Sequence, residues 1–369
     1  MKTFGVVQKI WVYTGLIIGA GLMALYSASF HNVRVPQKIF YDQLVCAGIG
    51  FLLMYAFSRL DYRRWYDWAY VLYFVNILLL IGVLVGGRHA LGARRWLVLG
   101  PVSFQPSELT KLALILMLGR YWSHRRPSLS FNLTSKARGL LMDLGVPLFL
   151  TGLSMVLIFK QPDLGTALLM FGIFLAALFV SGLEYRYLLG FLGGCAALLP
   201  LAWRFMKPYQ KDRLLVFLNP NIDPLGAGYT ITQSKIAIGS GRVFGKGWLA
   251  GTQNQLNFLP ERHTDFIFSV IGEEWGLIGG LFVLVLYFLL IDVALKMTMR
   301  VKDRFGMLVA IGIIAIFTLQ VVINIGMVMG MFPIVGLTLP LISYGRSSFV
   351  VFMMMIGILL SLARRHPVV

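Results

Sequence analysis

Ten long apolar runs are the feature that most constrains the fold of this chain. Each approaches the roughly 20 residues that an α-helix needs to cross a bilayer. Hydrophobic residues make up 58% of the chain and charged residues 13%, against about 25% in soluble domains. We therefore expect an all-α polytopic membrane protein with about ten transmembrane helices. The predicted spans begin near Ile10, Phe40, Trp68, Glu108, Leu140, Leu164, Tyr187, Phe266, Gly306 and Ser348.

The distribution of basic residues orients these spans. An even number of spans places both termini on one side of the membrane. With the N-terminus in the cytoplasm, seventeen Lys and Arg fall in inner segments and seven in short outer loops, as the positive-inside rule requires. We expect both termini to be cytoplasmic. The first apolar run leads into Phe30-His31-Asn32, which is no cleavage site, so we expect no cleaved signal peptide.

One large outer loop, residues 204–264, separates predicted spans seven and eight. Loops of this length are usually functional or disordered. Because this one contains eight Lys and Arg together with Phe244, Trp248 and Phe258, we expect it to be structured. It forms part of a single predicted transmembrane domain, residues 1–369.

Composition and spacing exclude several kinds of function. The net charge of +18 is scattered over short loops, so it favours a membrane surface or an anionic substrate over nucleic acid. Cys46 and Cys195 lie in apolar runs, which argues against a disulfide or a thiol mechanism. The five histidines lack the spacing of zinc ligands. The segment 241–247 resembles a phosphate-binding loop but lacks the required Gly and Ser or Thr positions.

Ionisable groups at the outer ends of the spans are the candidate functional residues, because charges in a membrane are costly and usually have a partner or a role. Glu108 and Lys111 lie three residues apart, which places them on one helix face. Two interpretations remain open: an internal ion pair, or a pair facing a cavity in which Lys111 meets an anionic substrate group. Asp163 is predicted either to cap the helix that follows it or to hold a substrate hydroxyl or a cation.

The densest polar run is Glu261-Arg262-His263-Thr264-Asp265, which leads directly into an apolar helix. A helix cap explains Thr264 or Asp265 alone. It does not explain three further ionisable residues beside them, so we expect acid–base or anion-handling chemistry at this position.

Taken in order, the motifs of this chain resemble those of the SEDS family of bacterial cell-wall polymerases. Gln161 and the Pro-Glu-Arg-His form of the motif before Asp265 are more similar to the elongation member than to the division member. The segments that carry the resemblance are Gly92–Trp96, Phe104–Lys111, Gln161–Thr166, Asp223–Tyr229, Gln233–Gly241, Gly245–Trp248, Gly251–Gln253, Phe258–Phe268, Gly272–Gly276, Asn324–Met327 and Pro340–Gly345.

The resemblance implies a peptidoglycan glycosyltransferase that polymerises lipid II at the outer face of the bacterial inner membrane during elongation. It also implies a class B penicillin-binding protein and other elongation-complex proteins as partners. The essential aspartate of the family matches Asp265. The reaction displaces undecaprenyl pyrophosphate by a sugar 4-hydroxyl with inversion, so Asp265 is the predicted general base.

The leaving pyrophosphate needs positive charge where negative charge develops. A divalent cation (Mg or Mn) is a further expectation, with no ligands assigned. Trp96 is predicted to pack on sugar or polyprenyl, or to anchor the chain at the membrane interface. The predicted substrate-binding residues are Glu108, Lys111, Trp96, Arg95, Asp163, Arg213, Lys235, Lys246, Glu261, Arg262, His263 and Ser343.

The chain departs from the family pattern at one position. Arg346 stands where the family usually has a second glycine after Ser343-Tyr-Gly. A glycine there permits a positive φ, whereas Arg346 resists it and adds a cation at the outer mouth. The division-type member of the SEDS family remains an alternative, and so do two other functions. A flippase for lipid-linked precursors could also have ten spans, but its charged or Gly- and Pro-broken spans should reach the cytoplasmic half of the membrane. A scaffold would not need the cluster of ionisable residues around Asp265.

Overall fold

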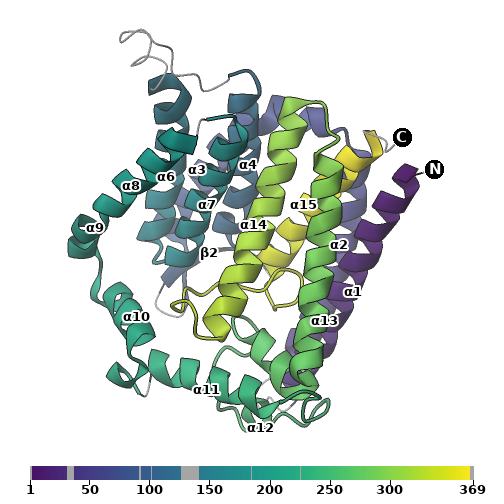
Figure 1. The fold of residues 1–369 in the computed structure, drawn as a ribbon, viewed down its shortest axis with the longest axis vertical. Helices are drawn as coiled ribbons and strands as arrows, with labels where there is room; N and C mark the ends of the chain where they lie inside the picture. The colour runs from purple at the N-terminus through teal and green to yellow at the C-terminus, as the bar shows by residue number, and fades with distance from the viewer. Residues whose placement is uncertain are drawn as a thin grey trace.

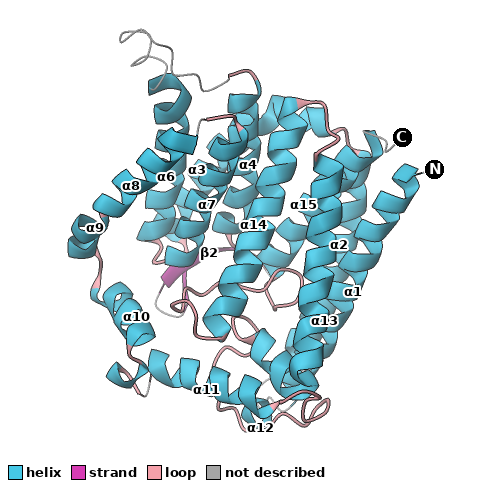
Figure 2. Ribbon diagram, viewed as in Figure 1, coloured by secondary structure: helices cyan, strands magenta, loops and turns pink. Residues whose placement is uncertain are grey.

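The computed structural model describes residues 2–30, 37–90, 93–100, 102–125, 141–183, 185–224 and 226–365. These residues are nearly all helical (Figure 2). The helices are α1 (Lys2–Phe30), α2 (Lys38–Arg59), α3 (Tyr62–Gly86), α4 (Pro106–Ser123), a π-helix (Leu141–Gly145), α6 (Val146–Lys160), α7 (Leu164–Val180), α8 (Tyr185–Ala197), α9 (Leu199–Phe205), α10 (Pro208–Leu218), a 3₁₀ helix (Pro220–Ile222), α11 (Ala227–Ser240), α12 (Thr252–Gln255), α13 (Ile267–Thr298), α14 (Arg304–Val328) and α15 (Arg346–Arg365).

The predicted spans correspond to helices of the structure. Within the described ranges, seven segments are long and apolar enough to cross a membrane, and α7 is a shorter apolar helix. The predicted seventh span is not one continuous helix, because the chain divides near Leu198 into α8 and α9. The polytopic helical fold is therefore confirmed, whereas the count of ten spans stays a prediction.

A small sheet between α3 and α4 is absent from the all-α prediction. It consists of β1 (Arg88–Ala90), β2 (Ala93–Leu99) and β3 (Val102–Phe104), paired antiparallel in the order β1-β2-β3. Two of these strands have only three residues, which is too short for an alternating hydrophobic pattern to be recognised. Strand β2 carries Arg95, one of the predicted substrate-binding residues.

Local sequence sets where several helices begin. Asp61, Asp163 and Asp303 precede α3, α7 and α14, and each side chain accepts a backbone N–H of the first turn. Pro106 occupies the first position of α4, where its missing N–H costs no hydrogen bond. These starts fix which residues lie at the helix ends, where the candidate site forms.

The helices pack around a buried centre. Nearly every residue of α4 is buried, and this helix contacts α3, α7 and α14. On the other side of the bundle, α15 packs mainly on α2, while α1 lies along α13 (Figure 1). Both chain termini lie at one end of the bundle, and α10, α11 and α12 cross the opposite end (Figure 1). The long loop is thus structured, as predicted.

Helices in lipid associate by close van der Waals packing, which small residues permit. Gly357 of α15 shows this against α2: a Cβ there would lie 2.7 Å from the carbonyl oxygen of Met54 and 2.7 Å from the Cβ of Phe57. Gly48 of α2 has nothing within 4 Å of the equivalent position.

We predict that Gly357→Ala lowers the melting temperature of the purified protein in detergent, because the added methyl group must push α15 away from α2. Gly48→Ala is the matched control. It should leave the melting temperature unchanged or raise it, since Ala is favoured over Gly in a helix by about 1 kcal/mol. Equal melting temperatures for the two variants would contradict this packing.

Candidate functional site

Asp265 lies immediately before α13 and faces the connection between α14 and α15. The residue is partly buried, and its Oδ2 lies 3.5 Å from the position that a Cβ on Gly336 would occupy. Gly336 has a φ of 69°, a conformation that few other residues adopt without strain. The carboxylate is therefore approached closely by backbone from a segment that is distant in the sequence.

Three successive carbonyl groups hold the backbone on which Asp265 stands. The amide of Tyr344 donates to the carbonyl of His263 at 2.8 Å. The hydroxyl of Ser343 donates to the carbonyl of Thr264 at 2.5 Å. The Nδ2 of Asn324, on α14, donates to the carbonyl of Asp265 at 2.9 Å. Each bond comes from α14 or from the segment between α14 and α15, so residues 263–265 are fixed across the bundle.

The charges around Asp265 tune its acidity. Burial, together with the negative charge of Glu261, raises the pKa of Asp265 to about 6, against the lowering effect of Arg213 and Arg95. Asp163 adds a smaller upward effect on this pKa. A carboxyl group with a pKa near 6 is ionised at neutral pH and yet is a stronger base than an ordinary aspartate.

The two arginines reach this region from different elements. Arg95, on β2, donates to the carbonyls of Gln161 and Pro162 in the turn between α6 and α7. Arg213, on α10, donates to the carbonyl of Ile334 at 3.2 Å. The small sheet and the long loop therefore each contribute a cation close enough to act on Asp265.

Asp163 has the helix-capping role that was one of its two predicted roles. Its carboxylate accepts from the amide of Thr166 at 3.2 Å and from the hydroxyl of Thr166 at 3.0 Å. The Nε2 of Gln105 lies 3.5 Å from its Oδ2. These bonds fix Asp163 at the start of α7, in the same region as Asp265.

Glu108 and Lys111 form a buried ion pair. The Nζ of Lys111 lies 2.8 Å from both carboxylate oxygens of Glu108 and 3.0 Å from Oε1 of Gln320. The side chain of Lys111 is completely buried. Because these three acceptors match the three donors of an ammonium group, the geometry agrees with the internal ion-pair interpretation. Gln320 in turn donates to the carbonyl of Thr338 at 2.9 Å, which ties the pair to the segment that holds Asp265.

Two predicted substrate-binding cations have partners within the protein. The guanidinium of Arg262 is buried and donates to the carbonyls of Ala28 and Asn254 at 2.9 and 2.7 Å. The Nζ of Lys246 pairs with Glu273 at 2.7 Å. The structure therefore gives both side chains a role in anchoring the loop and does not bring them to Asp265.

The other predicted residues occupy different positions. Lys235 is exposed on α11 and lies against Gly330, and Trp96 lies on β2 opposite Arg88. Burial lowers the pKa of His263, so its ring is neutral near pH 7. Ser343 holds the backbone beside Asp265 and is itself buried.

Gln320 and Asn324 were not among the predicted site residues, although Asn324 begins one of the segments that carry the family resemblance. Both are fully buried on α14 and lie four residues apart on one face. The Nδ2 of Asn324 donates to the carbonyl of Leu337 at 2.6 Å as well as to that of Asp265. Two amide side chains at helical spacing inside an apolar span were the available signal, because such groups need internal partners in lipid.

The described ranges contain no group of three His, Cys, Asp or Glu side chains placed to hold a metal ion. Asp163 is engaged as a helix cap, and Glu261 is exposed and receives the hydroxyl of Thr264 at 3.3 Å. These residues do not make a ligand set for a divalent cation, and we derive no chemical step through one.

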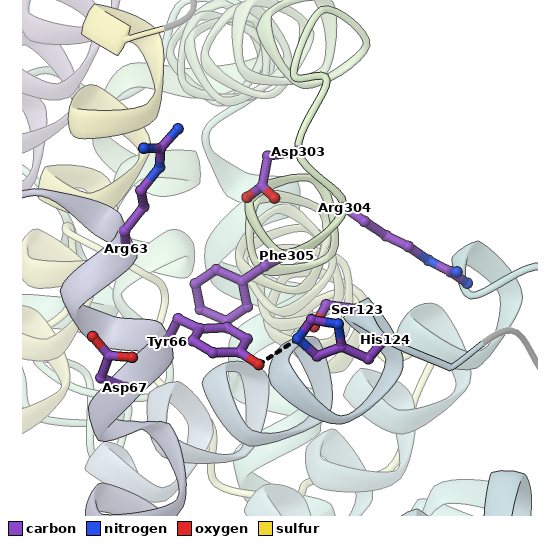
Figure 3. Close-up of a pocket in the computed structure, with 8 residues that line it drawn as sticks. All are labelled: Arg63, Tyr66, Asp67, Ser123, His124, Asp303, Arg304 and Phe305. Atoms are coloured by element: carbon purple, nitrogen blue, oxygen red, sulfur yellow. Dashed lines mark hydrogen bonds between the residues drawn. The ribbon is translucent and has the colours of Figure 1, made fainter.

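A cavity of 330 Å³ lies at the end of the bundle that carries the termini, away from Asp265. Arg63, Asp67, Asp303 and Arg304 line it, and two other lining residues, Tyr66 and His124, are hydrogen-bonded to each other at 2.5 Å (Figure 3). Its Asp and Arg side chains balance each other in charge. It is separate from the site around Asp265.

Comparison with known proteins decides the family. The FtsW/RodA/SpoVE model, described as "Cell cycle protein", matches residues 7–367. The chain belongs to the FtsW/RodA/SpoVE family.

Several known members of the family are similar to this chain over almost their whole length. Peptidoglycan glycosyltransferase MrdB of Escherichia coli K12 is 42% identical over 354 residues, covering 95% of this chain and 90% of MrdB. A solved structure showing coordination of polymerization and crosslinking by a peptidoglycan synthase complex has a TM-score of 0.81 and 36% identity, with 97% of each chain covered. The crystal structure of Thermus thermophilus rod shape determining protein RodA has a TM-score of 0.70 and 32% identity, covering 97% of this chain and 96% of that one. The predicted enzyme class is confirmed.

The departure from the FtsW/RodA/SpoVE pattern is explained by a partner on α2. Arg346 begins α15 and has no positive φ. Its guanidinium pairs with Asp42, and its Nε lies 3.1 Å from the hydroxyl of Tyr344. Arg346 therefore fastens the start of α15 to α2, next to the residue whose amide holds His263.

We predict that Lys111→Met strongly lowers the stability of the protein. Removing one partner of a buried ion pair leaves the other charge uncompensated, typically at a cost of about 3–5 kcal/mol. The double variant Glu108→Gln with Lys111→Met should recover most of the loss, because no unpaired charge remains. Thermal unfolding of the purified proteins measures both. A double variant less stable than Lys111→Met alone would contradict the interpretation.

Proposed function

We propose that this protein polymerises lipid II into glycan strands at the outer face of the bacterial inner membrane during cell elongation, with Asp265 as the general base. The observation that carries the proposal is the setting of Asp265: a carboxyl group with a raised pKa, on a backbone fixed at three carbonyls, within the field of two arginines. The names of the relatives support the substrate class.

The geometry supports a direct displacement. The carboxylate of Asp265 accepts the proton of the incoming sugar 4-hydroxyl while that oxygen forms a bond to the anomeric carbon. The bond from the anomeric carbon to the undecaprenyl pyrophosphate oxygen breaks, and inversion follows from attack on the opposite face. Pyrophosphate is a good leaving group, so the reaction does not need a second carboxylic acid of the kind that glycosidases use.

Arg213 and Arg95 are the cations best placed to stabilise the departing pyrophosphate. Both act electrostatically on Asp265, and they come from different elements, α10 and β2. Fixed positive charge in a site with little water stabilises a developing anion more strongly than water does. The buried Lys111 does not contact the pyrophosphate in this proposal; it donates to Gln320 and so helps to hold the segment that fixes Asp265.

The same proposal includes partners and location. A class B penicillin-binding protein is the proposed partner, supported by the similar chain solved as part of a peptidoglycan synthase complex. The end of the bundle with Asp265 faces outward, supported by the excess of Lys and Arg in segments at the opposite end. A divalent cation is also proposed, with no protein ligand assigned to it; loss of polymerisation on chelation of the purified complex would support it, and an unchanged rate would exclude it.

We predict that Asp265→Asn abolishes polymerisation of purified lipid II by the complex with its cognate penicillin-binding protein. The amide cannot accept the proton, so the rate should fall by at least about 10²-fold while the melting temperature is kept. Asp292→Asn is the matched control, because Asp292 lies on the helix that follows Asp265, near its other end.

Two outcomes would count against the proposal in different ways. Polymer formation by Asp265→Asn at the wild-type rate would show that Asp265 is not the base. Absence of polymer with the intact wild-type complex would contradict the polymerase function itself and favour the flippase alternative.

We also predict the pH dependence of the reaction. Asp265 must be ionised to act as a base, so the rate should fall as the pH drops through about 6. Glu261 raises the pKa of Asp265, so Glu261→Gln should lower that pKa and shift the acid limb of the profile to lower pH. The shift is measured from initial rates of polymerisation across pH. Asp292→Asn should show no shift, and an unchanged limb in Glu261→Gln would contradict the coupling.

A further inference from the structure

The segment Gly241–Trp248 exposes large apolar side chains although it belongs to the long polar loop. Phe244 is 81% exposed, and Val243 and Trp248 are each 48% exposed. Exposed apolar groups that cluster in this way usually mark a contact with a partner or with lipid. The neighbours of the segment show which of the two it is.

The segment is bonded to a break in α13. Gly276 has φ 67° and ψ −160°, which interrupts the helix. The amides that follow the break are paired with the segment instead: Leu277 donates to the carbonyl of Arg242 at 2.9 Å, and Ile278 donates to that of Val243 at 3.2 Å. In the other direction, the amide of Lys246 donates to the carbonyl of Glu273 at 3.0 Å.

Beyond the break, α13 presents an apolar face. This helix is long and apolar enough to cross a membrane, and its exposed side chains after Gly276 are those of a lipid-facing surface. Between Gly276 and Leu290 they are Leu277, Ile278, Leu281, Phe282, Leu284, Val285 and Phe288. Because Leu277 and Ile278 are bonded directly to Arg242 and Val243, the segment lies directly beside the start of this lipid-facing surface.

Aromatic residues border the segment on its other side. Trp248 packs on Tyr26 with ring centroids 5.6 Å apart and donates to the carbonyl of Met23 at 3.3 Å. Tyr26 contacts Phe40, at the start of α2, at 5.3 Å. Aromatic side chains that gather at the ends of spans form the belt that marks a membrane–water interface. The belt places Gly241–Trp248 at the depth of the lipid headgroups.

We propose that Gly241–Trp248 is a membrane-contact site that inserts Phe244 into the acyl region of the leaflet at the Asp265 end of the bundle. Arg242 lies two residues before Phe244 and is exposed, and a basic side chain at this depth reaches lipid phosphates. Since the segment is bonded at the break in α13, its insertion fixes the depth of that break in the bilayer. Asp265 lies just before the same helix, so its depth relative to the membrane surface is fixed as well. The proposal does not depend on the reaction.

The test measures the surroundings of Phe244 directly. Cys46 and Cys195, the cysteines of the chain, are first replaced by Ala. Single variants Phe244→Cys, Phe282→Cys and Thr232→Cys are then spin-labelled in vesicles of phosphatidylethanolamine and phosphatidylglycerol. Phe282 is the reference for lipid, on the exposed face of α13, and Thr232 is the reference for water, exposed on α11. Collision rates with oxygen and with a polar nickel chelate are compared, and an unchanged melting temperature confirms the fold of each variant.

The label at position 244 should collide several-fold more with oxygen than with the nickel chelate, as at position 282. The label at position 232 should show the opposite preference. A label at position 244 that follows the pattern of position 232 would overturn the proposal and assign the exposed surface to a protein partner.

Discussion

The three hydrogen bonds to the carbonyls of residues 263–265 are the interaction on which the rest of the site depends. A carboxylate at the end of a loop would ordinarily sample many positions, and a base must lie within hydrogen-bond reach of the proton it removes. Tyr344, Ser343 and Asn324 remove that freedom by binding the backbone rather than the carboxylate. The side chain is therefore positioned without being neutralised.

The surrounding polar groups form a support that runs through the bundle. Glu108 and Lys111 neutralise each other in a place where neither charge alone is tolerated. Gln320 joins this pair to the segment between α14 and α15, and Arg346 joins the same segment to α2. Helices α2, α4 and α14 thus converge on the stretch of chain that fixes Asp265. Changes far from the carboxylate are expected to act on the reaction through its position.

Much of the fold could be predicted because lipid imposes a simple rule on sequence. Long apolar runs predicted the helices, and the dense polar run before α13 made Asp265 the candidate base, which stays a prediction. The small sheet was missed because strands of three residues carry no periodic signal. Asn324 was missed because a single amide hardly changes the hydropathy of an apolar span. Its importance comes from contacts to residues distant in the sequence.

The predictions for the basic residues show the limit of reading charge alone. Arg262 and Lys246 have the same charge as Arg213 and Arg95, and both lie in the long loop. Burial and position distinguish them: Arg262 is buried and Lys246 is paired with Glu273, whereas Arg213 and Arg95 are only partly buried and lower the pKa of Asp265. Glu273, which accepts from Lys246, and Ala28, which accepts from Arg262, are distant from these residues in the sequence, so only the fold brings them together.

The central claim is that the carboxylate of Asp265 faces the acceptor hydroxyl and that Arg213 and Arg95 face the pyrophosphate. A structure of the Asp265→Asn protein with lipid II bound, in complex with its penicillin-binding protein, tests this most directly. The account predicts the side chain of residue 265 within about 2.6–3.2 Å of a sugar 4-hydroxyl. It also predicts at least one of the two guanidinium groups on the pyrophosphate. A lipid II headgroup bound with its 4-hydroxyl remote from residue 265 would contradict the account.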